Sequence, residues 1–275
     1  MPDNPTEETV EIQWVYTPAD FFDEKIERNC EGYTVEIEGG RATARMSAAF
    51  YRPGGDFQHE LAEELRSYFR LWQLDRRKVI EIRGPSVRRI HPDGRTDITI
   101  VVDDIVCVSE VGDINLRWTD ANGVVYDSRR EHFATMKGKV ELLLCHASDQ
   151  KAHRILESHA GSIASPGEEL VYLYEIWDAL MKKFKGKNSA LRVLGILPET
   201  KTRFYDLTCN LPLRQGRHRG RHDTLRDATA GELDEARRIA QDMILGYWKY
   251  LDDRQKSKQA GACDSKKGAR GGGND

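Results

Sequence analysis

The chain has few cysteines, and their arrangement argues against both a set of disulfide bonds and a bound zinc ion. Its 275 residues include five cysteines, an odd number, and none forms a Cys-x-x-Cys pair or a Cys/His spacing typical of zinc sites. We therefore expect neither a disulfide framework nor a bound metal, and no motif indicates a cofactor. Reduced, mostly buried thiols of a cytoplasmic protein are predicted at Cys30, Cys107, Cys145, Cys209 and Cys263.

Long apolar runs and an excess of one charge are also lacking. No stretch approaches the roughly 18 apolar residues that a membrane-spanning helix needs. The opening residues, MPDNPTEETVEIQW, are polar and acidic and have no apolar signal-peptide core. We therefore expect a cytoplasmic protein without a membrane partner. With 42 basic and 45 acidic residues the net charge is −3, so any binding of anions must come from a local patch.

Alternating apolar and polar residues are present through the N-terminal half, and this period is typical of strands. TVEIQWVYT (9–17) predicts one strand, and 33–47 predicts a hairpin that turns at Gly39-Gly40. Helical spacing over 56–74 predicts an amphipathic helix. Further elements are expected as a short helix at 19–27, strands at 78–84 and 97–111 with a turn at Pro92-Asp93-Gly94, and a hairpin at 114–128 turning at Asn122-Gly123.

These patterns predict an α+β fold with a mostly antiparallel sheet domain over residues 1–140. The Asp103-Asp104 pair has the chemistry of metal ligands, but no third ligand stands at a known spacing. We interpret it as a strand-end or bulge pair. No nucleophile elbow, P-loop or dinucleotide fingerprint is present in this half, so its role is not predicted.

The second half has helical spacing and predicts an all-α bundle over residues 148–252. Ser148 is a candidate N-cap for a first helix. Two capping boxes predict further helix starts, Ser165-Pro-Gly-Glu168 and Thr229-Ala-Gly-Glu232. The Lys/Gly/Ser-rich end, 253–275, is expected to be a disordered tail.

One connection in the bundle, residues 211–228, is longer than helix–helix connections usually are. It contains five arginines and two histidines with two interleaved glycines. Arginine forks match phosphate oxygens, and histidine can move protons near neutral pH. The loop, here called the Arg/His loop, carries Arg214, Arg217, His218, Arg219, Arg221, His222 and Arg226, with Gly216 and Gly220 between them.

Three interpretations of the Arg/His loop remain open. It can be a solvated basic face, in which some arginines pair with acidic residues such as Glu168, Glu169, Glu175 and Asp178. It can contact RNA or DNA without sequence preference. It can also perform chemistry on a phosphodiester, with arginines that stabilise the anion and a histidine that acts as acid or base.

The helical half resembles the HEPN superfamily of nucleotide-binding domains. The matching residues are the Arg-x(4–6)-His element Arg217-His-Arg-Gly-Arg-His222 and the surrounding segments 169–180, 209–222 and 225–244. The resemblance covers about residues 148–252. Two other segments fit the same spacing, Arg52…His59 and Arg154…His159, and the third is preferred for its neighbours.

The resemblance implies a metal-independent endoribonuclease, or an RNA-binding protein, that acts in bacterial defence or stress and forms a homodimer. Arg217 would stabilise the charge of the transition state, and His222 would be the acid or base. Substrate contacts would come from Asn210, Arg214, His218, Arg219 and Arg221, with Glu175 or Asp178 as supporting carboxylates. The alternative is a non-enzymatic interaction or dimerisation protein whose basic loop binds an acidic partner or nucleic acid.

Overall fold

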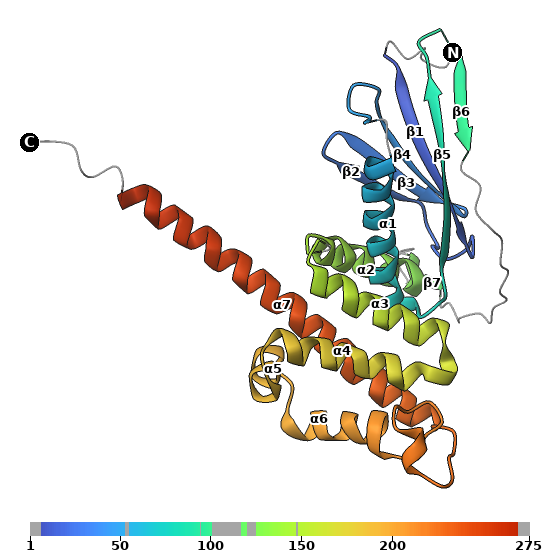
Figure 1. Ribbon diagram of the computed structural model, residues 1–275. Helices are drawn as coiled ribbons and strands as arrows, with labels where there is room; N and C mark the ends of the chain where they lie inside the picture. The colour runs from blue at the N-terminus through green and yellow to red at the C-terminus, as the bar shows by residue number, and fades with distance from the viewer. Residues whose placement is uncertain are drawn as a thin grey trace, which may run out of the picture. The chain divides into compact units, whose positions relative to one another are not determined.

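The computed structural model describes residues 7–52, 55–93, 95–100, 117–119, 125–146 and 148–268. The chain forms two compact units, Met1–Leu142 and Leu143–Asp275. The first unit contains an antiparallel sheet and the second is helical, which confirms the predicted α+β class (Figure 1). The boundary falls inside one helix, α2 (Ser128–Leu144), close to the predicted domain end at residue 140.

Unit 1 is built on a six-stranded antiparallel sheet with the order β2-β3-β4-β1-β5-β6. The hairpin predicted at Gly39-Gly40 is confirmed, with Tyr33 paired to Met46 and Glu38 to Arg41. A second sheet pairs β7 with β8 at the predicted position of the 114–128 hairpin. The strands are β1 (Thr9–Thr17), β2 (Ile26–Cys30), β3 (Tyr33–Glu38), β4 (Arg41–Ser47), β5 (Glu81–Ile90), β6 (Thr96–Ile100), β7 (Arg117–Thr119) and β8 (Val125–Asp127).

One face of the large sheet is covered by α1 (Gly55–Arg76), which confirms the predicted amphipathic helix. Alternate residues of β1 are buried, and the ring of Tyr16 packs on that of Phe69 with centroids 5.1 Å apart. The core of this unit therefore lies between sheet and helix. On the opposite face a polar hollow of about 370 Å³ is lined by Glu11, Gln13, Thr43 and Arg45, among others.

The helix predicted at 19–27 is wrong, because turns occupy this segment and β2 begins at Ile26. Phe21 and Phe22 are consecutive and both buried, at 0% and 8% exposure. A helix would send two successive side chains about 100° apart, whereas an irregular turn lets both rings reach Phe69. Of the strand predicted at 97–111, the part after Ile100 lies outside the described residues, and so does the Asp103-Asp104 pair.

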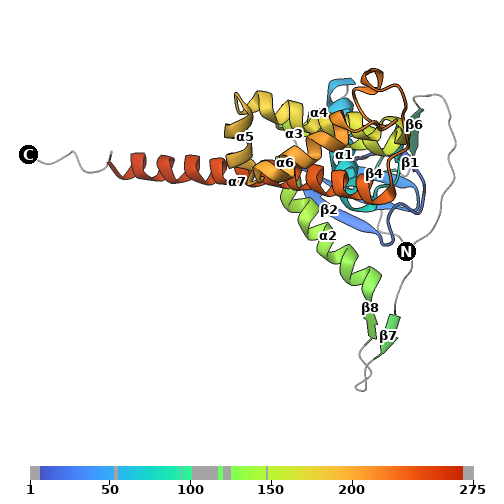
Figure 2. The ribbon, with the colours of Figure 1, turned by 90° about the horizontal axis from the view of Figure 1, so that it is seen from below.

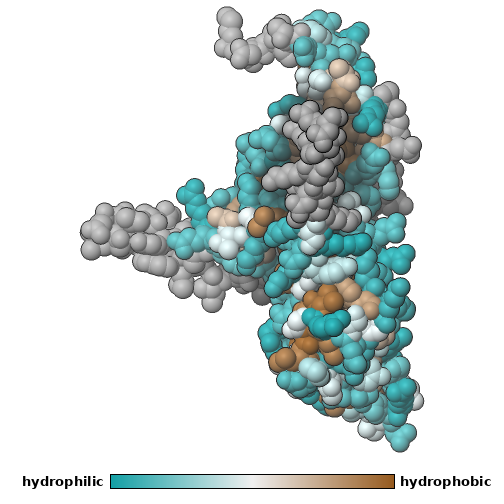
Figure 3. Space-filling model, turned by 90° about the vertical axis from the view of Figure 1, so that its left-hand side faces the viewer, coloured by the Kyte–Doolittle hydropathy of each residue, from teal (hydrophilic) through white to brown (hydrophobic). Residues whose placement is uncertain are grey.

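Unit 2 packs its helices along the first half of α7, as Figures 1 and 2 show. Its core contains Leu173, Trp177, Leu207, Met243 and Tyr247, all at most 2% exposed. Some large apolar side chains remain on the surface of unit 2. Figure 3 shows apolar residues gathered there among polar ones. The helices are α3 (Gln150–Ala164), α4 (Glu169–Lys183), α5 (Lys187–Leu194), α6 (Pro198–Tyr205) and α7 (Ala230–Gly268). None of the described helices is long and apolar enough to cross a membrane.

Two predicted helix starts are wrong in detail. The side chain of Asp149, not of Ser148, accepts hydrogen bonds from the first turn of α3. At Ser165 no side-chain cap forms, because Pro166–Glu168 makes a 3-10 turn (η1) in which the Glu168 N–H donates to the Ser165 carbonyl, 2.9 Å. The helix α4 therefore begins at Glu169. The Glu169 carboxylate is 2% exposed and is held by Arg237 through contacts of 2.6 and 2.8 Å.

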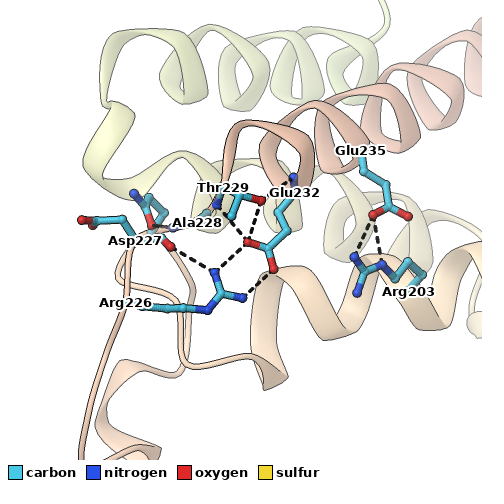
Figure 4. Close-up of polar contacts among 8 residues, drawn as sticks. Arg203, Arg226, Asp227, Ala228, Thr229, Glu232 and Glu235 are labelled. Atoms are coloured by element: carbon cyan, nitrogen blue, oxygen red, sulfur yellow. Dashed lines mark hydrogen bonds and ion pairs between the residues drawn. The ribbon is translucent and has the colours of Figure 1, made fainter.

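The capping box at Thr229 is confirmed (Figure 4). The Glu232 N–H donates to Thr229 Oγ1 at 3.2 Å, and Glu232 Oε2 accepts from the Thr229 N–H at 2.9 Å. The helix that it opens, α7, continues to Gly268, so the segment 253–268 is helical where a disordered tail was expected. Lysine, glutamine, alanine and arginine, which are strong helix formers, make up nine of the sixteen residues at 253–268, whereas three consecutive glycines stand later, at 271–273.

Candidate anion-binding site

The Arg/His loop is held in one shape by backbone hydrogen bonds. Leu213 is 1% exposed and forms a parallel bridge with Arg226, in which the Arg214 N–H donates to the Arg226 carbonyl at 2.9 Å. No regular helix spans the loop, which contains only the 3-10 turn η3 (Arg219–Arg221). Gly216 is buried, and a Cβ there would lie 3.1 Å from the Leu213 carbonyl. That glycine therefore permits a close approach of the chain to itself.

A π-helical turn, η2 (Asp206–Asn210), fixes the middle of the loop to the bundle. The hydrogen bond of this turn spans five residues, as in a π-helix, with the Leu211 N–H donating to the Asp206 carbonyl at 2.9 Å. The Thr208 carbonyl accepts the Arg217 N–H at 2.8 Å. The backbone of Arg217 is thus bound to the bundle while its side chain is exposed.

Three of the five arginines in the loop pair with carboxylates. Arg226 forms a two-pronged pair with Glu232, 2.6 and 2.7 Å, and supports the capping box (Figure 4). Arg219 lies 3.5 Å from Glu168, and its Nε donates to the Gly216 carbonyl. Arg214 lies 3.8 Å from Asp227, a contact between two well exposed side chains. Some arginines of the loop therefore pair internally, and of the acidic residues named in that interpretation only Glu168 is such a partner.

Arg217 and Arg221 differ from those three. Both side chains are exposed, and within the described residues neither has a carboxylate within 4 Å. The Arg217 guanidinium lies over the ring of Tyr174 on α4, 4.7 Å from its centroid. A cation–π contact of this kind restrains the side chain and leaves its N–H donors open to a ligand.

A lysine that the sequence analysis missed joins the same surface. Lys201 lies 4.3 Å from the centroid of the Tyr205 ring, and the Tyr205 and Tyr174 rings are 6.1 Å apart. Burial lowers the pKa of Lys201, and the neighbouring charge of Lys187 on α5 lowers it further. Two ammonium groups held near each other favour the approach of an anion. The spacing of Lys201 and Tyr205, four residues apart on α6, is the sequence signal that could have pointed to this pair.

Beneath these cations lies Cys209, which is 2% exposed. Burial raises the pKa of its thiol, although Arg217, Lys201 and Arg221 act in the opposite direction. The thiol is therefore protonated at neutral pH and is no nucleophile. The charges that act on this thiol come from α6 and from the loop, so residues of both segments lie close together. We call this surface the Arg217 patch, and it consists of Lys187, Lys201, Arg217, His218 and Arg221 around Tyr174, Tyr205 and Cys209.

The two loop histidines lie in different surroundings. The pKa of His218 is lowered by partial desolvation and by the charges of Arg221 and Arg217, so this imidazole is neutral at pH 7 and part of the Arg217 patch. In His222, Nε2 is buried and has no hydrogen-bond partner among the described residues. Among the described contacts no hydrogen bond or ring contact joins His222 to Arg217. His218, in contrast, directly follows Arg217 in the chain, and the charge of Arg217 lowers the pKa of His218.

The remaining predicted site residues already have partners within the helices. Asn210 donates to Asp206 at 2.7 Å, and Glu175 accepts from Ser158 on α3 at 3.2 Å. Asp178 binds Lys182 one turn along α4 at 2.7 Å, although its charge also acts on Tyr174. Within the described residues, none of the three has a hydrogen bond or ion pair with Arg217 or His222.

The two competing Arg…His segments differ in the exposure of their histidines. In Arg154…His159 the arginine is exposed while the histidine is 3% exposed within the core of unit 2. In Arg52…His59 the arginine lies over Phe57, 5.7 Å from the ring centroid, and His59 is exposed on α1. The burial of His159 argues against the first segment, and the preference for the Arg/His loop over the second stays a prediction.

Comparison with protein-family models, curated proteins and solved structures finds no match. The resemblance to HEPN domains thus remains a prediction that rests on the residues quoted for it. The chemistry available to the Arg217 patch follows from its own geometry. Arginine and lysine donors that no described carboxylate pairs with can hold phosphate oxygens, and the Tyr174 and Tyr205 rings restrain Arg217 and Lys201 beside them.

Proposed function

We propose that this protein binds single-stranded RNA through the Arg217 patch, as a HEPN-like RNA-binding or RNA-cleaving protein. One observation carries the proposal. Arg217 lies over the Tyr174 ring and Lys201 over the Tyr205 ring, while Arg221 and Lys187 act electrostatically on neighbouring groups of the same patch. No described carboxylate lies within 4 Å of these four cations, although Asp206 acts on Lys201 from farther away. Proteins that bind single strands combine cationic groups for the phosphates with aromatic side chains for the bases.

Because the chain as a whole is slightly acidic, contact with nucleic acid would depend on the Arg217 patch itself. A net charge of −3 gives the molecule no general attraction for nucleic acid, so phosphate affinity must come from these few side chains. A duplex presents its phosphates over a longer track, whereas a compact patch of cations beside aromatic side chains suits a flexible single strand. A homodimer remains a prediction of the resemblance.

The cleaving form of the proposal assigns charge stabilisation to Arg217. For the proton acceptor, the geometry favours His218 over His222. His218 is neutral at pH 7 and adjoins Arg217 and Arg221, while the Nε2 atom of His222 is buried. A neutral imidazole beside two guanidinium groups can accept the 2′-hydroxyl proton of RNA while the arginines hold the phosphate.

The binding test is fluorescence anisotropy of a labelled single-stranded RNA in the presence of EDTA. We expect Arg217→Ala and Arg221→Ala each to weaken binding by about 10- to 100-fold, since a charge-assisted hydrogen bond contributes about 1.5–3 kcal/mol. Arg238→Ala is the matched control, because it removes an equal charge from an exposed position on α7. Equal affinities of the Arg217 and Arg238 variants would exclude the patch.

The same RNA, analysed by gel after incubation, tests cleavage. We expect metal-independent products from the wild-type protein and none from Arg217→Ala, with His218→Ala more damaging than His222→Ala. Binding without any products in several RNAs would leave the non-enzymatic form, a protein that holds RNA without cutting it. Neither binding nor products would favour the alternative in which the loop serves an acidic protein partner.

A further inference from the structure

Three potential metal ligands of different chemistry meet at the other end of the packed part of α7. They are the Cys145 thiol and the His146 imidazole, which follow α2, and the Asp252 carboxylate on α7. One ligand atom from each lies within 4.8 Å of the other two. All three belong to unit 2, and none takes part in the Arg217 patch.

The spacing of these atoms is close to that of a bound zinc ion. Zinc bonds of about 2.0–2.3 Å in tetrahedral geometry place neighbouring ligand atoms roughly 3.3–3.6 Å apart. The His146 ring nitrogen and an Asp252 oxygen are now 2.6 Å apart, so they would separate slightly, and the thiol would move inward. Cys145 and Asp252 are exposed, so their side chains have room to rotate toward a common ion.

The segment that carries these ligands is already fixed to α7. His146 is 8% exposed. Nearby, Trp248 Nε1 donates to the Leu143 carbonyl at 2.8 Å and the Tyr247 hydroxyl donates to Asp149 at 2.9 Å. Ligands held by such contacts lose little freedom when a metal binds, which favours affinity.

We propose that Cys145, His146 and Asp252 bind one Zn²⁺ ion or a similar borderline divalent ion, with water as the fourth ligand. The ligand set of sulfur, imidazole nitrogen and carboxylate oxygen selects such ions over Mg²⁺ and Ca²⁺, which take oxygen ligands. The site joins the segment after α2 to α7, so occupancy stabilises unit 2. The sequence shows no zinc-binding spacing because the third ligand, Asp252, lies 106 residues after His146.

The test uses the full-length, untagged chain and Co²⁺ as a spectroscopic probe. We expect one Co²⁺ per chain, with a thiolate-to-metal charge-transfer band and the intense visible bands of a tetrahedral site, both displaced by one equivalent of Zn²⁺. Cys145→Ser should abolish the charge-transfer band. Loss of outer-shell partners alone weakens metal sites by about 10- to 100-fold, so Asp252→Asn should weaken binding at least that much.

Matched controls are Cys30→Ser, which removes a thiol from unit 1, and Asp253→Asn, which removes the neighbouring exposed carboxylate. Both should bind Co²⁺ as the wild type does. Cys145 and Asp252 are exposed, so their variants should fold, and circular dichroism would verify this. The proposal is overturned if no charge-transfer band appears, if the band survives in Cys145→Ser, or if Mg²⁺ raises the melting temperature as much as Zn²⁺.

Discussion

Arg217 combines three properties that no other arginine of the loop has together. Its backbone N–H is bound by Thr208, its guanidinium rests on the Tyr174 ring, and no described carboxylate neutralises it. Composition could identify the loop as basic but could not separate its five arginines. The separation depends on Glu168, Asp227 and Glu232, of which Glu168 precedes Arg219 by about fifty residues, so only the folded chain shows which arginines are engaged.

His218 gives the Arg217 patch a predictable response to pH. Its pKa in the free protein is below 6.5, chiefly through desolvation and then through Arg221 and Arg217. A bound phosphate offsets these cations and favours the imidazolium, so the pKa is higher in the complex. RNA affinity should therefore rise as the pH falls toward 6, and this gain should be lost as the pH rises through the pKa of the complex.

The measurement is RNA anisotropy between pH 5.5 and 8 at constant ionic strength. The gain is limited to about tenfold for each pKa unit by which RNA raises the pKa of His218. His218→Gln should remove the dependence, while His59→Gln, which changes an exposed histidine on α1, should keep it. A dependence that persists in His218→Gln would assign it to another group.

At the scale of single elements, the start of α7 stabilises the end of the Arg/His loop. The hydrogen bonds to Arg226 lower the pKa of Glu232 to about 2, and bonds from Thr229 act in the same direction. A carboxylate whose pKa is lowered in the folded state stabilises the fold above its unfolded pKa of 4.5. This contribution is lost as the pH falls from about 4.5 toward 2.

Thr229→Ala should therefore lower the free energy of unfolding by about 1 kcal/mol at pH 7, the usual effect of removing an N-cap. Glu232→Gln should also destabilise at pH 7, and its difference from wild type should shrink as the pH approaches 2. Urea denaturation followed by circular dichroism measures both. Thr202→Ala is the control, because that hydroxyl donates to the Pro198 carbonyl inside α6 and its loss should change stability by less than about 0.5 kcal/mol. An equal loss in both threonine variants would contradict the capping role.

Elements with a local cause were predictable from sequence, and elements with a tertiary cause were not. The hairpin at Gly39-Gly40 and the Thr229 capping box follow from residues three to fourteen positions apart, and both are present. The signal at Ser165 had the same letters as a capping box, but Pro166–Glu168 forms a 3-10 turn and α4 begins at Glu169, whose carboxylate pairs with Arg237 on α7. The candidate site shows the same limit, since Lys201 and Tyr174 join Arg217 only through the packing of α4, α6 and the loop.

At the scale of the whole molecule, charge is balanced but unevenly distributed. The chain has three more acidic than basic residues, yet the cations of the Arg217 patch have no described carboxylate within 4 Å. Nucleic-acid binding by such a protein should be less sensitive to salt than binding by a strongly basic one. The reason is that only the phosphates held by the patch release counterions.

This difference can be measured as the slope of log affinity against log salt concentration. Each phosphate neutralised on a single strand contributes about −0.7, so the four cations Lys187, Lys201, Arg217 and Arg221 predict a slope between roughly −2 and −3. Arg217→Ala should make the slope shallower by about 0.7, whereas Arg238→Ala should leave it unchanged. A slope near zero would mean that the RNA is not held by its phosphates. A slope much steeper than −3 would mean that cations elsewhere on the chain hold it, and the Arg217 patch would then be at most a small part of the RNA site.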